Sequence, residues 1–142
     1  MRPKRRASRT SLRLMTCLDT SFLIDLLNGT DAAAETMTDL DDQGTRHAVS
    51  PVTAAELWIG TNLGSVQEFR RTEELLESLL WLEINRSCAR RAGRIQAELI
   101  ESGSELGFND CLIAATAIEH GEPLVTGASD FERVPDLRIR TY

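Results

Sequence analysis

Short apolar segments typical of β-strands alternate with longer, helix-like segments from Met15 to Tyr142. The strand-like segments are residues 15–19, 47–50, 81–84, 123–126 and 137–142. The segments whose apolar residues favour helices are 20–29, 32–43, 53–64, 65–80, 87–102 and 109–121. Strands separated by helices are joined by right-handed crossovers, which produce a parallel sheet covered on both faces. The pattern therefore predicts an α/β sandwich with a mainly parallel central sheet.

Residues 1–14 (MRPKRRASRTSLRL) differ from the rest because they contain six basic residues, no acidic residue and no apolar periodicity. Such a composition predicts a disordered extension. It is either a nucleic-acid-binding arm or the product of an upstream start site, and the second is favoured because Met15 begins a strand-like segment at once. We expect one folded domain, residues 15–142, which is long enough to bury a core.

The charge of that domain is strongly acidic. Residues 15–142 hold 10 basic and 22 acidic residues, a formal charge of −12 against −6 for the whole chain. Affinity for nucleic acid comes mainly from neutralisation of phosphates by Lys and Arg, so this balance argues against nonspecific binding to polyanions.

Neither a membrane anchor nor a disulfide framework is indicated. No apolar run approaches the roughly 18 to 20 residues that span a bilayer, and no cleavable signal peptide is recognisable, so we expect a cytoplasmic protein without membrane contact. Cys17, Cys88 and Cys111 are far apart and have no metal-ligand spacing, which predicts buried, reduced thiols.

Four acidic residues lie where the predicted strands end. Asp19 ends the first strand, Glu56 lies just after the second, Asp110 opens the helix before the fourth, and Asp130 follows the fourth. The reactive crevice of an open α/β sheet lies at the carboxyl ends of its strands. We therefore expect these side chains to share one rim of the sheet.

Carboxylates gathered in this way need a counter-charge. At about 4 Å and an effective dielectric constant near 20, each ionised pair repels by about 4 kcal/mol. Three or four carboxylates normally indicate a hard divalent cation, Mg²⁺ with Mn²⁺ as the alternative. Such an ion activates water against a phosphodiester, which predicts hydrolysis without a covalent enzyme intermediate.

Each acid also has a purely structural interpretation. Glu56 lies three residues after Thr53, which matches a capping box. Asp110 could complement its helix dipole, worth about 0.3 to 1 kcal/mol, and Asp130 could cap the short turn that follows it. Asp19 is hardest to explain in this way, because an acid at the end of an apolar strand is costly without a partner.

Four segments together resemble the PIN-domain nucleases, specifically VapC-type toxins. They cover most of residues 15–142 in family order and read CLDTSFLIDLL, SPVTAAELWIG, ELGFNDCLIAATAIEHGEPLVT and DFERVPDLRI. The resemblance implies a PIN-like α/β/α sandwich, Mg²⁺-dependent endoribonuclease activity, an RNA substrate, a cognate VapB-like antitoxin and a homodimer. The alternatives are a PIN nuclease of RNA maturation and a non-catalytic PIN-like module whose acidic groove holds a basic partner.

The resemblance also implies roles for individual residues. Asp19 and Asp110 are the expected metal ligands, Glu56 binds the metal directly or through water, and Thr20 or Ser21 supports Asp19 by hydrogen bonding. All three acids are expected to be catalytic.

The resemblance also bears on three further positions. Asp130 aligns with the acid of the family's DF pair and is a fourth catalytic candidate. Many relatives have an acid or Asn where this chain has Ala128. Asn109 occupies a position where such toxins often have a polar or charged residue.

Arginines recur every four residues at Arg86, Arg90 and Arg94, with Arg91 beside them. They form either a stripe that tracks phosphates or a surface charge that pairs with nearby Glu, and the second interpretation is favoured.

Two tryptophans and two histidines have functional and structural interpretations. Trp58 and Trp81 could stack on RNA bases, but packing is favoured because Trp58 lies between Leu57 and Ile59. The two histidines, at 47 and 120, are predicted to be structural.

Overall fold

The computed structural model describes residues 14–142, so the predicted extension, residues 1–14, lies outside the described part except for its last residue. The helices and strands are β1 (Met15–Leu18), α2 (Thr20–Leu27), α3 (Asp31–Asp42), β2 (Arg46–Val49), α4 (Pro51–Asn62), α5 (Val66–Glu77), β3 (Leu80–Trp81), α6 (Arg86–Glu101), α7 (Phe108–Glu119), β4 (Leu124–Val125), the 3₁₀ helix η1 (Ser129–Arg133) and β5 (Ile139–Arg140).

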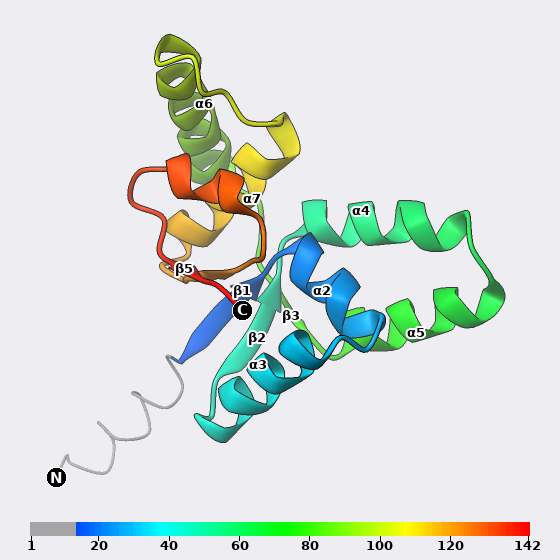
Figure 1. The fold of residues 1–142 in the computed structure, drawn as a ribbon. Helices are drawn as coiled ribbons and strands as arrows, with labels where there is room; N and C mark the ends of the chain where they lie inside the picture. The colour runs from blue at the N-terminus through cyan, green and yellow to red at the C-terminus, as the bar shows by residue number, and fades with distance from the viewer. Residues whose placement is uncertain (1–13) are drawn as a thin grey trace, which may run out of the picture.

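The five strands form one sheet in the order β3-β2-β1-β4-β5, and every neighbouring pair is parallel. Strand β1 is central, with Cys17 opposite Ala48 of β2 and Leu124 of β4. The crossover connections place helices on both sides of the sheet, as Figure 1 shows. The predicted α/β sandwich with a parallel sheet is confirmed.

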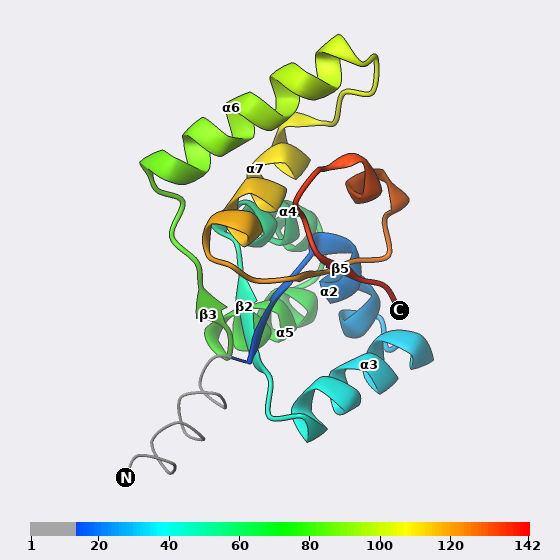
Figure 2. The ribbon, with the colours of Figure 1, turned by 90° about the vertical axis from the view of Figure 1, so that its left-hand side faces the viewer.

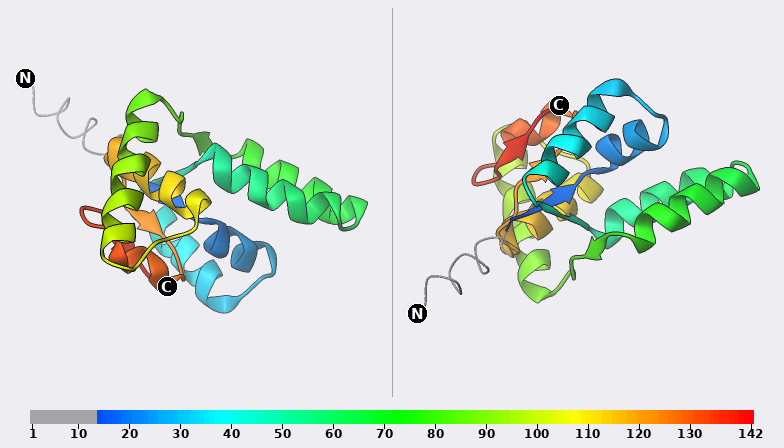
Figure 3. Two further views of the ribbon diagram at one scale, coloured as in Figure 1. Left: turned by 90° about the horizontal axis from the view of Figure 1, so that it is seen from above. Right: turned by 90° about the horizontal axis from the view of Figure 1, so that it is seen from below.

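Each face of the sheet has its own hydrophobic core. Cys17 belongs to the core beneath α6 and α7, whereas the next residue, Leu18, belongs to the core beneath α2, α3, α4 and α5. This division follows from the alternation of side chains along a strand. Figure 2 shows α6 lying across α7 on its side of the molecule, and Figure 3 shows α4 and α5 as a helical hairpin that projects from the body.

The start of α4 differs from the sequence prediction. The helix begins at Pro51, and its cap is Ser50, whose hydroxyl accepts a hydrogen bond from the Val52 amide at 3.1 Å. Proline is favoured at the first helical position because its φ is preset and its missing N–H is not needed there. Thr53 therefore lies inside the helix, and the predicted capping box of Thr53 and Glu56 is wrong.

A capping box does occur one helix later. Ser65 accepts from the Glu68 amide, and the Glu68 carboxylate accepts from the Ser65 amide, both at 3.1 Å.

The cysteine prediction is confirmed, since Cys17, Cys88 and Cys111 are all free and buried. Burial, reinforced by the nearby charges of Asp19 and Glu122, raises the pKa of the Cys17 thiol to about 12. Among residues 14–142, no helix combines the length and the apolar character that a membrane crossing requires.

Candidate active site

Three of the predicted acids lie near one another at the carboxyl edge of the sheet. Asp19 directly follows the central strand β1 and occupies the cap position of α2, Glu56 lies on α4, and Asp110 is the third residue of α7. The negative charges of Asp19 and Glu56 both act on Asp110. The sequence prediction that these side chains share one rim is therefore consistent with their placement.

Asp19 is held by two hydroxyl groups. Its side chain is almost completely buried, and its Oδ2 accepts hydrogen bonds from Ser21 Oγ at 2.9 Å and Thr126 Oγ1 at 2.7 Å. Both bonds go to Oδ2, and no side chain or backbone N–H of the described residues donates to Oδ1. The arrangement fixes the carboxylate while leaving one oxygen available as a ligand.

Thr126 is a site residue that the sequence reasoning did not identify. It is fully buried at the end of β4, and its hydroxyl accepts from the Ala128 amide at 3.0 Å while it donates to Asp19. Its position offered a signal, because β4 is the parallel neighbour of β1 and a polar residue at its carboxyl end must face the same rim.

Glu56 joins three helices. Its Oε1 accepts from Thr20 Oγ1 of α2 at 2.6 Å, and its Oε2 accepts from Asn109 Nδ2 of α7 at 3.4 Å. The carboxylate is thus directed at the site rather than at the end of its own helix. The two hydroxyls suggested as supports for Asp19 divide their roles, since Ser21 bonds to Asp19 and Thr20 bonds to Glu56.

The pKa of Asp110 is raised by its surroundings. Burial, followed by the negative charges of Asp19, Glu56 and Asp130, raises its pKa to about 6. The cap residue of α7 is Gly107, which has no side chain to bond to the first turn of the helix. Burial and nearby like charges disfavour the ionised form of this carboxyl group, and a bound cation would stabilise that form more than a helix dipole alone.

Asp130 is engaged elsewhere. Its carboxylate forms a 2.6 Å ion pair with Nη2 of Arg133, and Nη1 of that arginine donates to the carbonyls of Ser104 and Glu105 at 2.9 Å. Asp130 is exposed, and the cap of η1 is Ala128, so the capping interpretation of Asp130 does not hold.

Asp25 of α2 bonds to a residue outside the group of Asp19, Glu56 and Asp110. Its Oδ2 accepts a 2.5 Å hydrogen bond from the Tyr142 hydroxyl, and the Tyr142 ring packs edge-on against Phe22.

The oxygen atoms of these acids are the ligands that a hard divalent cation prefers. Within residues 14–142, no three His, Cys, Asp or Glu side chains form a preassembled group for a metal. Mg²⁺ commonly uses only one or two carboxylates and keeps several waters, so it does not require such a group. The open Oδ1 of Asp19 and the carboxylate of Asp110 are hard oxygen donors of this kind.

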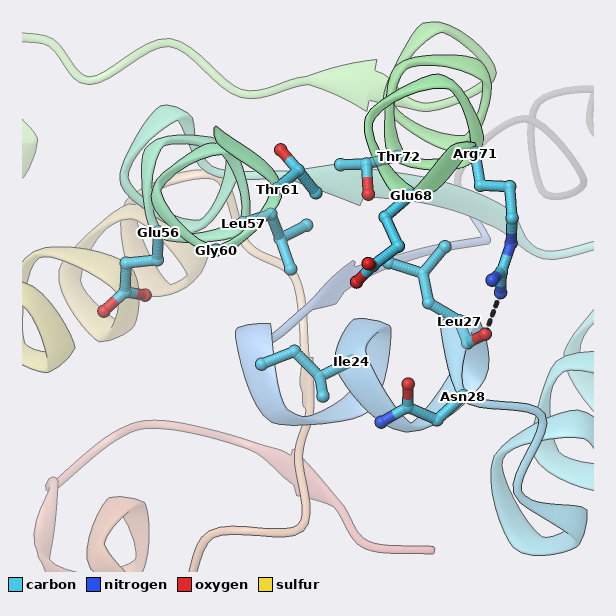
Figure 4. A pocket seen from close by; sticks show the side chains of 10 residues that line it. All are labelled: Ile24, Leu27, Asn28, Glu56, Leu57, Gly60, Thr61, Glu68, Arg71 and Thr72. Carbon is cyan, nitrogen blue, oxygen red and sulfur yellow. Dashed lines mark hydrogen bonds between the residues drawn. The ribbon is translucent and has the colours of Figure 1, made fainter. Parts of the chain in front are cut away.

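A groove of about 260 Å³ adjoins Glu56 between α2, α4 and α5. Figure 4 shows Glu56 at one end and Arg71 at the other, where the guanidinium donates to the Leu27 carbonyl. Ile24, which is 44% exposed, and Leu57 supply apolar surface between them.

The remaining residues that the sequence singled out lie elsewhere. Trp58 and Trp81 pack against each other with ring centroids 5.8 Å apart, which confirms the packing interpretation. His47 bonds to Asp41 at 2.6 Å, and Nε2 of His120 lies 2.8 Å from the Glu83 carbonyl, in agreement with structural roles.

Comparison with known proteins gives the following matches. Residues 16–137 match the family model described as the PIN domain. Ribonuclease VapC19 of Mycobacterium tuberculosis is 30% identical over 125 residues, covering 87% of this chain and 98% of that protein. Ribonuclease VapC2 of Haemophilus influenzae is 31% identical over 128 residues, covering 88% and 96%.

Solved structures agree with these matches. The structure of VapBC2 from Rickettsia felis bound to a DNA fragment from its promoter superimposes with a TM-score of 0.82 at 26% identity, covering 90% of this chain and 98% of that chain. DNA-bound VapBC from Salmonella typhimurium has a TM-score of 0.79 at 28% identity, with the same coverage.

Proposed function

The chain belongs to the PIN-domain family and, within it, to the VapC-type proteins, and from this premise we propose that it is a Mg²⁺-dependent endoribonuclease that acts as the toxin of a toxin–antitoxin pair. The observation that carries the proposal is that Asp19, Glu56 and Asp110 lie near one another at the carboxyl edge of the sheet, where burial and then the like charges raise the pKa of Asp110 to about 6. Repulsion among these carboxylates destabilises the fold, so their proximity favours a functional role over a structural one.

The residues divide the work as follows. Asp19 and Asp110 would hold the cation, Mg²⁺ or Mn²⁺, and Glu56 would bind it through water. When bound, such an ion lowers the pKa of a coordinated water and offsets the charge that develops on the phosphodiester. Ser21 and Thr126 keep the Asp19 carboxylate oriented, which preserves the geometry that catalysis needs.

Glu56 is the candidate for orienting the attacking water and accepting its proton. Its hydrogen bonds from Thr20 and Asn109 fix the carboxylate between α2 and α7, next to Asp110. General base catalysis requires this kind of fixed position within reach of the reacting group.

The test is cleavage of messenger and structured RNA by the purified protein. We expect cleavage with Mg²⁺ or Mn²⁺, none with EDTA, and none from Asp19→Asn. Cleavage that survives EDTA or the Asp19 substitution contradicts the proposal. A protein that cleaves RNA but is harmless when overproduced belongs instead to RNA maturation, and one that binds a basic partner without taking up Mg²⁺ or Mn²⁺ in calorimetry is a binding module.

The partner we propose is a VapB-like antitoxin. The relatives with the solved structures above were crystallised as VapBC complexes, and this chain has a groove with both apolar and polar side chains that ends at Glu56. An extended segment of an antitoxin lying there, with a basic side chain near the carboxylates, would block the site. Coexpression with a candidate antitoxin encoded directly upstream is expected to restore growth and to yield a complex that copurifies.

We also propose that the chain forms a homodimer. The end of the α4–α5 hairpin exposes Ile59, Leu63 and Val66, which are 64%, 85% and 73% exposed. Apolar surface of this kind commonly marks an interface. Light scattering of the purified protein is expected to give twice the chain mass, and a monomer at all concentrations contradicts this part of the proposal.

A further inference from the structure

The first half of α6 concentrates positive charge that the candidate active site does not use. Residues 84–97 contain four arginines and no acidic residue, although the domain as a whole has 22 acidic residues and only 10 basic ones. Such a segregation of charge is unusual in a protein whose net charge is strongly negative.

The arginines are displayed outward in a row. Arg86, Arg90 and Arg94 are all exposed and follow one another at intervals of four residues, which corresponds to a rise of about 6 Å along the helix. The opposite side of α6 is buried in the core through Cys88, Ala92, Ile95 and Leu99. The packing of that apolar side fixes the direction of the row.

The charge of the row is not cancelled by neighbouring acids. Among the described residues, Arg86, Arg90 and Arg94 form no ion pair, and Glu98, four residues after Arg94, is not bonded to it. Arg91 differs, because its Nε donates to Glu119 at 2.8 Å and its Nη1 lies 3.9 Å from Asp136. The sequence analysis favoured pairing with Glu, and this holds for Arg91 alone.

The row borders a depression of about 320 Å³ lined by Ser87, Arg90, Arg91, Arg94 and Glu119. The depression is large enough for several water molecules or for a polar group. The Ser87 hydroxyl and the guanidinium groups are hydrogen-bond donors, whereas the Glu119 carboxylate is already bonded to Arg91.

We propose that the arginine row, Arg86, Arg90 and Arg94, binds the phosphate backbone of single-stranded RNA and holds substrate outside the carboxylate site; this rests on the proposed function. The guanidinium group matches phosphate through paired hydrogen bonds. An acidic nuclease repels RNA over most of its surface, so a local row of unpaired arginines supplies the attraction that the rest of the domain lacks.

Helix α7 relates the row to the active site. Asp110 lies in its first turn and Glu119, the partner of Arg91, ends it. Nine residues of α-helix span about 13 Å. Figure 2 shows α6 lying across α7. An RNA strand that reaches the carboxylates can therefore reach the row within a few nucleotides.

The test is binding of a fluorescein-labelled single-stranded RNA of mixed sequence, measured by anisotropy in EDTA over a series of salt concentrations. The double variant Arg90→Gln/Arg94→Gln is compared with Arg46→Gln/Arg70→Gln, which removes the same charge from two exposed arginines elsewhere. Each lost phosphate contact lowers the salt slope for single strands by about 0.7, so we expect a fall of about 1.4 and, at about 0.1 M salt, binding about 25-fold weaker. The control pair is expected to change binding less than about twofold.

Two results overturn this inference: equal affinities and salt slopes for the two double variants, and displacement of the RNA by poly-glutamate at equal charge concentration. Circular dichroism checks that the variants remain folded.

Asp19→Asn separates the two proposals, because it is expected to bind RNA as the wild type does and to cleave none. Absence of cleavage by every protein overturns the ribonuclease proposal while a binding defect confined to Arg90→Gln/Arg94→Gln still supports the row.

Discussion

The hydroxyl of Thr20 donates a 2.6 Å hydrogen bond to Oε1 of Glu56 and so ties the start of α2 to α4. Thr20 adjoins Asp19 in the chain. The same short segment therefore positions Asp19 and orients the carboxylate of Glu56. The remaining oxygen of Glu56 faces Asn109, the neighbour of Asp110. Each of the three acids is therefore linked to another through a polar residue, and substitutions of these linking residues test the site.

Thr20→Val is expected to lower kcat/KM for RNA about tenfold with little change in melting temperature. The substitution preserves shape and removes a hydrogen bond to a charged group, for which about 1.5 to 3 kcal/mol is typical. Steady-state cleavage assays at saturating Mg²⁺ measure the effect. Thr20→Ser keeps the hydroxyl and should retain most activity, and an equal loss in both variants would assign the defect to packing instead.

Thr126→Val is expected to destabilise the metal-free protein by about 1 to 3 kcal/mol, because it removes a donor from the buried carboxylate of Asp19. Urea unfolding at pH 7 in EDTA measures this difference. Ser21→Ala removes the other donor at a half-buried position, so a smaller loss is expected. Unchanged stability of Thr126→Val would show that Asp19 does not depend on this bond.

The fold and the acidic rim could be predicted because they depend on periodicity and on a general property of parallel sheets. The alternation of segments after Met15 requires crossovers, and crossovers bring strand ends together. Asp19 and Asp110 could thus be placed on one rim without knowledge of any side-chain contact.

The partners of these acids could not be predicted in the same way. Thr53 and Glu56 have the spacing of a capping box, but Pro51 is a better first residue for the helix and moves the cap to Ser50. Which hydroxyl bonds to which carboxylate depends on side-chain rotamers, so the separate roles of Thr20 and Ser21 became visible only in the structure.

Asp130→Asn is expected to reduce cleavage less than about tenfold, whereas Asp19→Asn should reduce it by about 100-fold or more. The reason is that Asp130 is paired with Arg133, which the carbonyls of Ser104 and Glu105 hold in place. Parallel cleavage assays of the two variants measure the difference. If Asp130→Asn is as inactive as Asp19→Asn, then Asp130 leaves its arginine to join the metal site.

Asp110→Asn is expected to stabilise the metal-free protein at pH 7 while abolishing cleavage. The folded-state pKa of Asp110 is raised from 3.8 to about 6, so the folded state holds its proton more tightly than the unfolded state. The stability that this proton contributes is complete below about pH 4 and is lost as the pH rises to about 6. The substitution removes the ionisable carboxyl group, so the variant does not lose this stability as the pH rises.

Urea unfolding in EDTA between pH 4 and 7 tests that sign. The wild type is expected to lose stability across the window, Asp110→Asn to lose less, and Glu35→Gln, at an exposed position on α3, to follow the wild type. Addition of Mg²⁺ at pH 7 should raise the stability of the wild type and not that of Asp110→Asn, because binding to the folded state alone stabilises it. A variant that is less stable than the wild type at pH 7 in EDTA would mean that Asp110 supports the fold rather than opposes it.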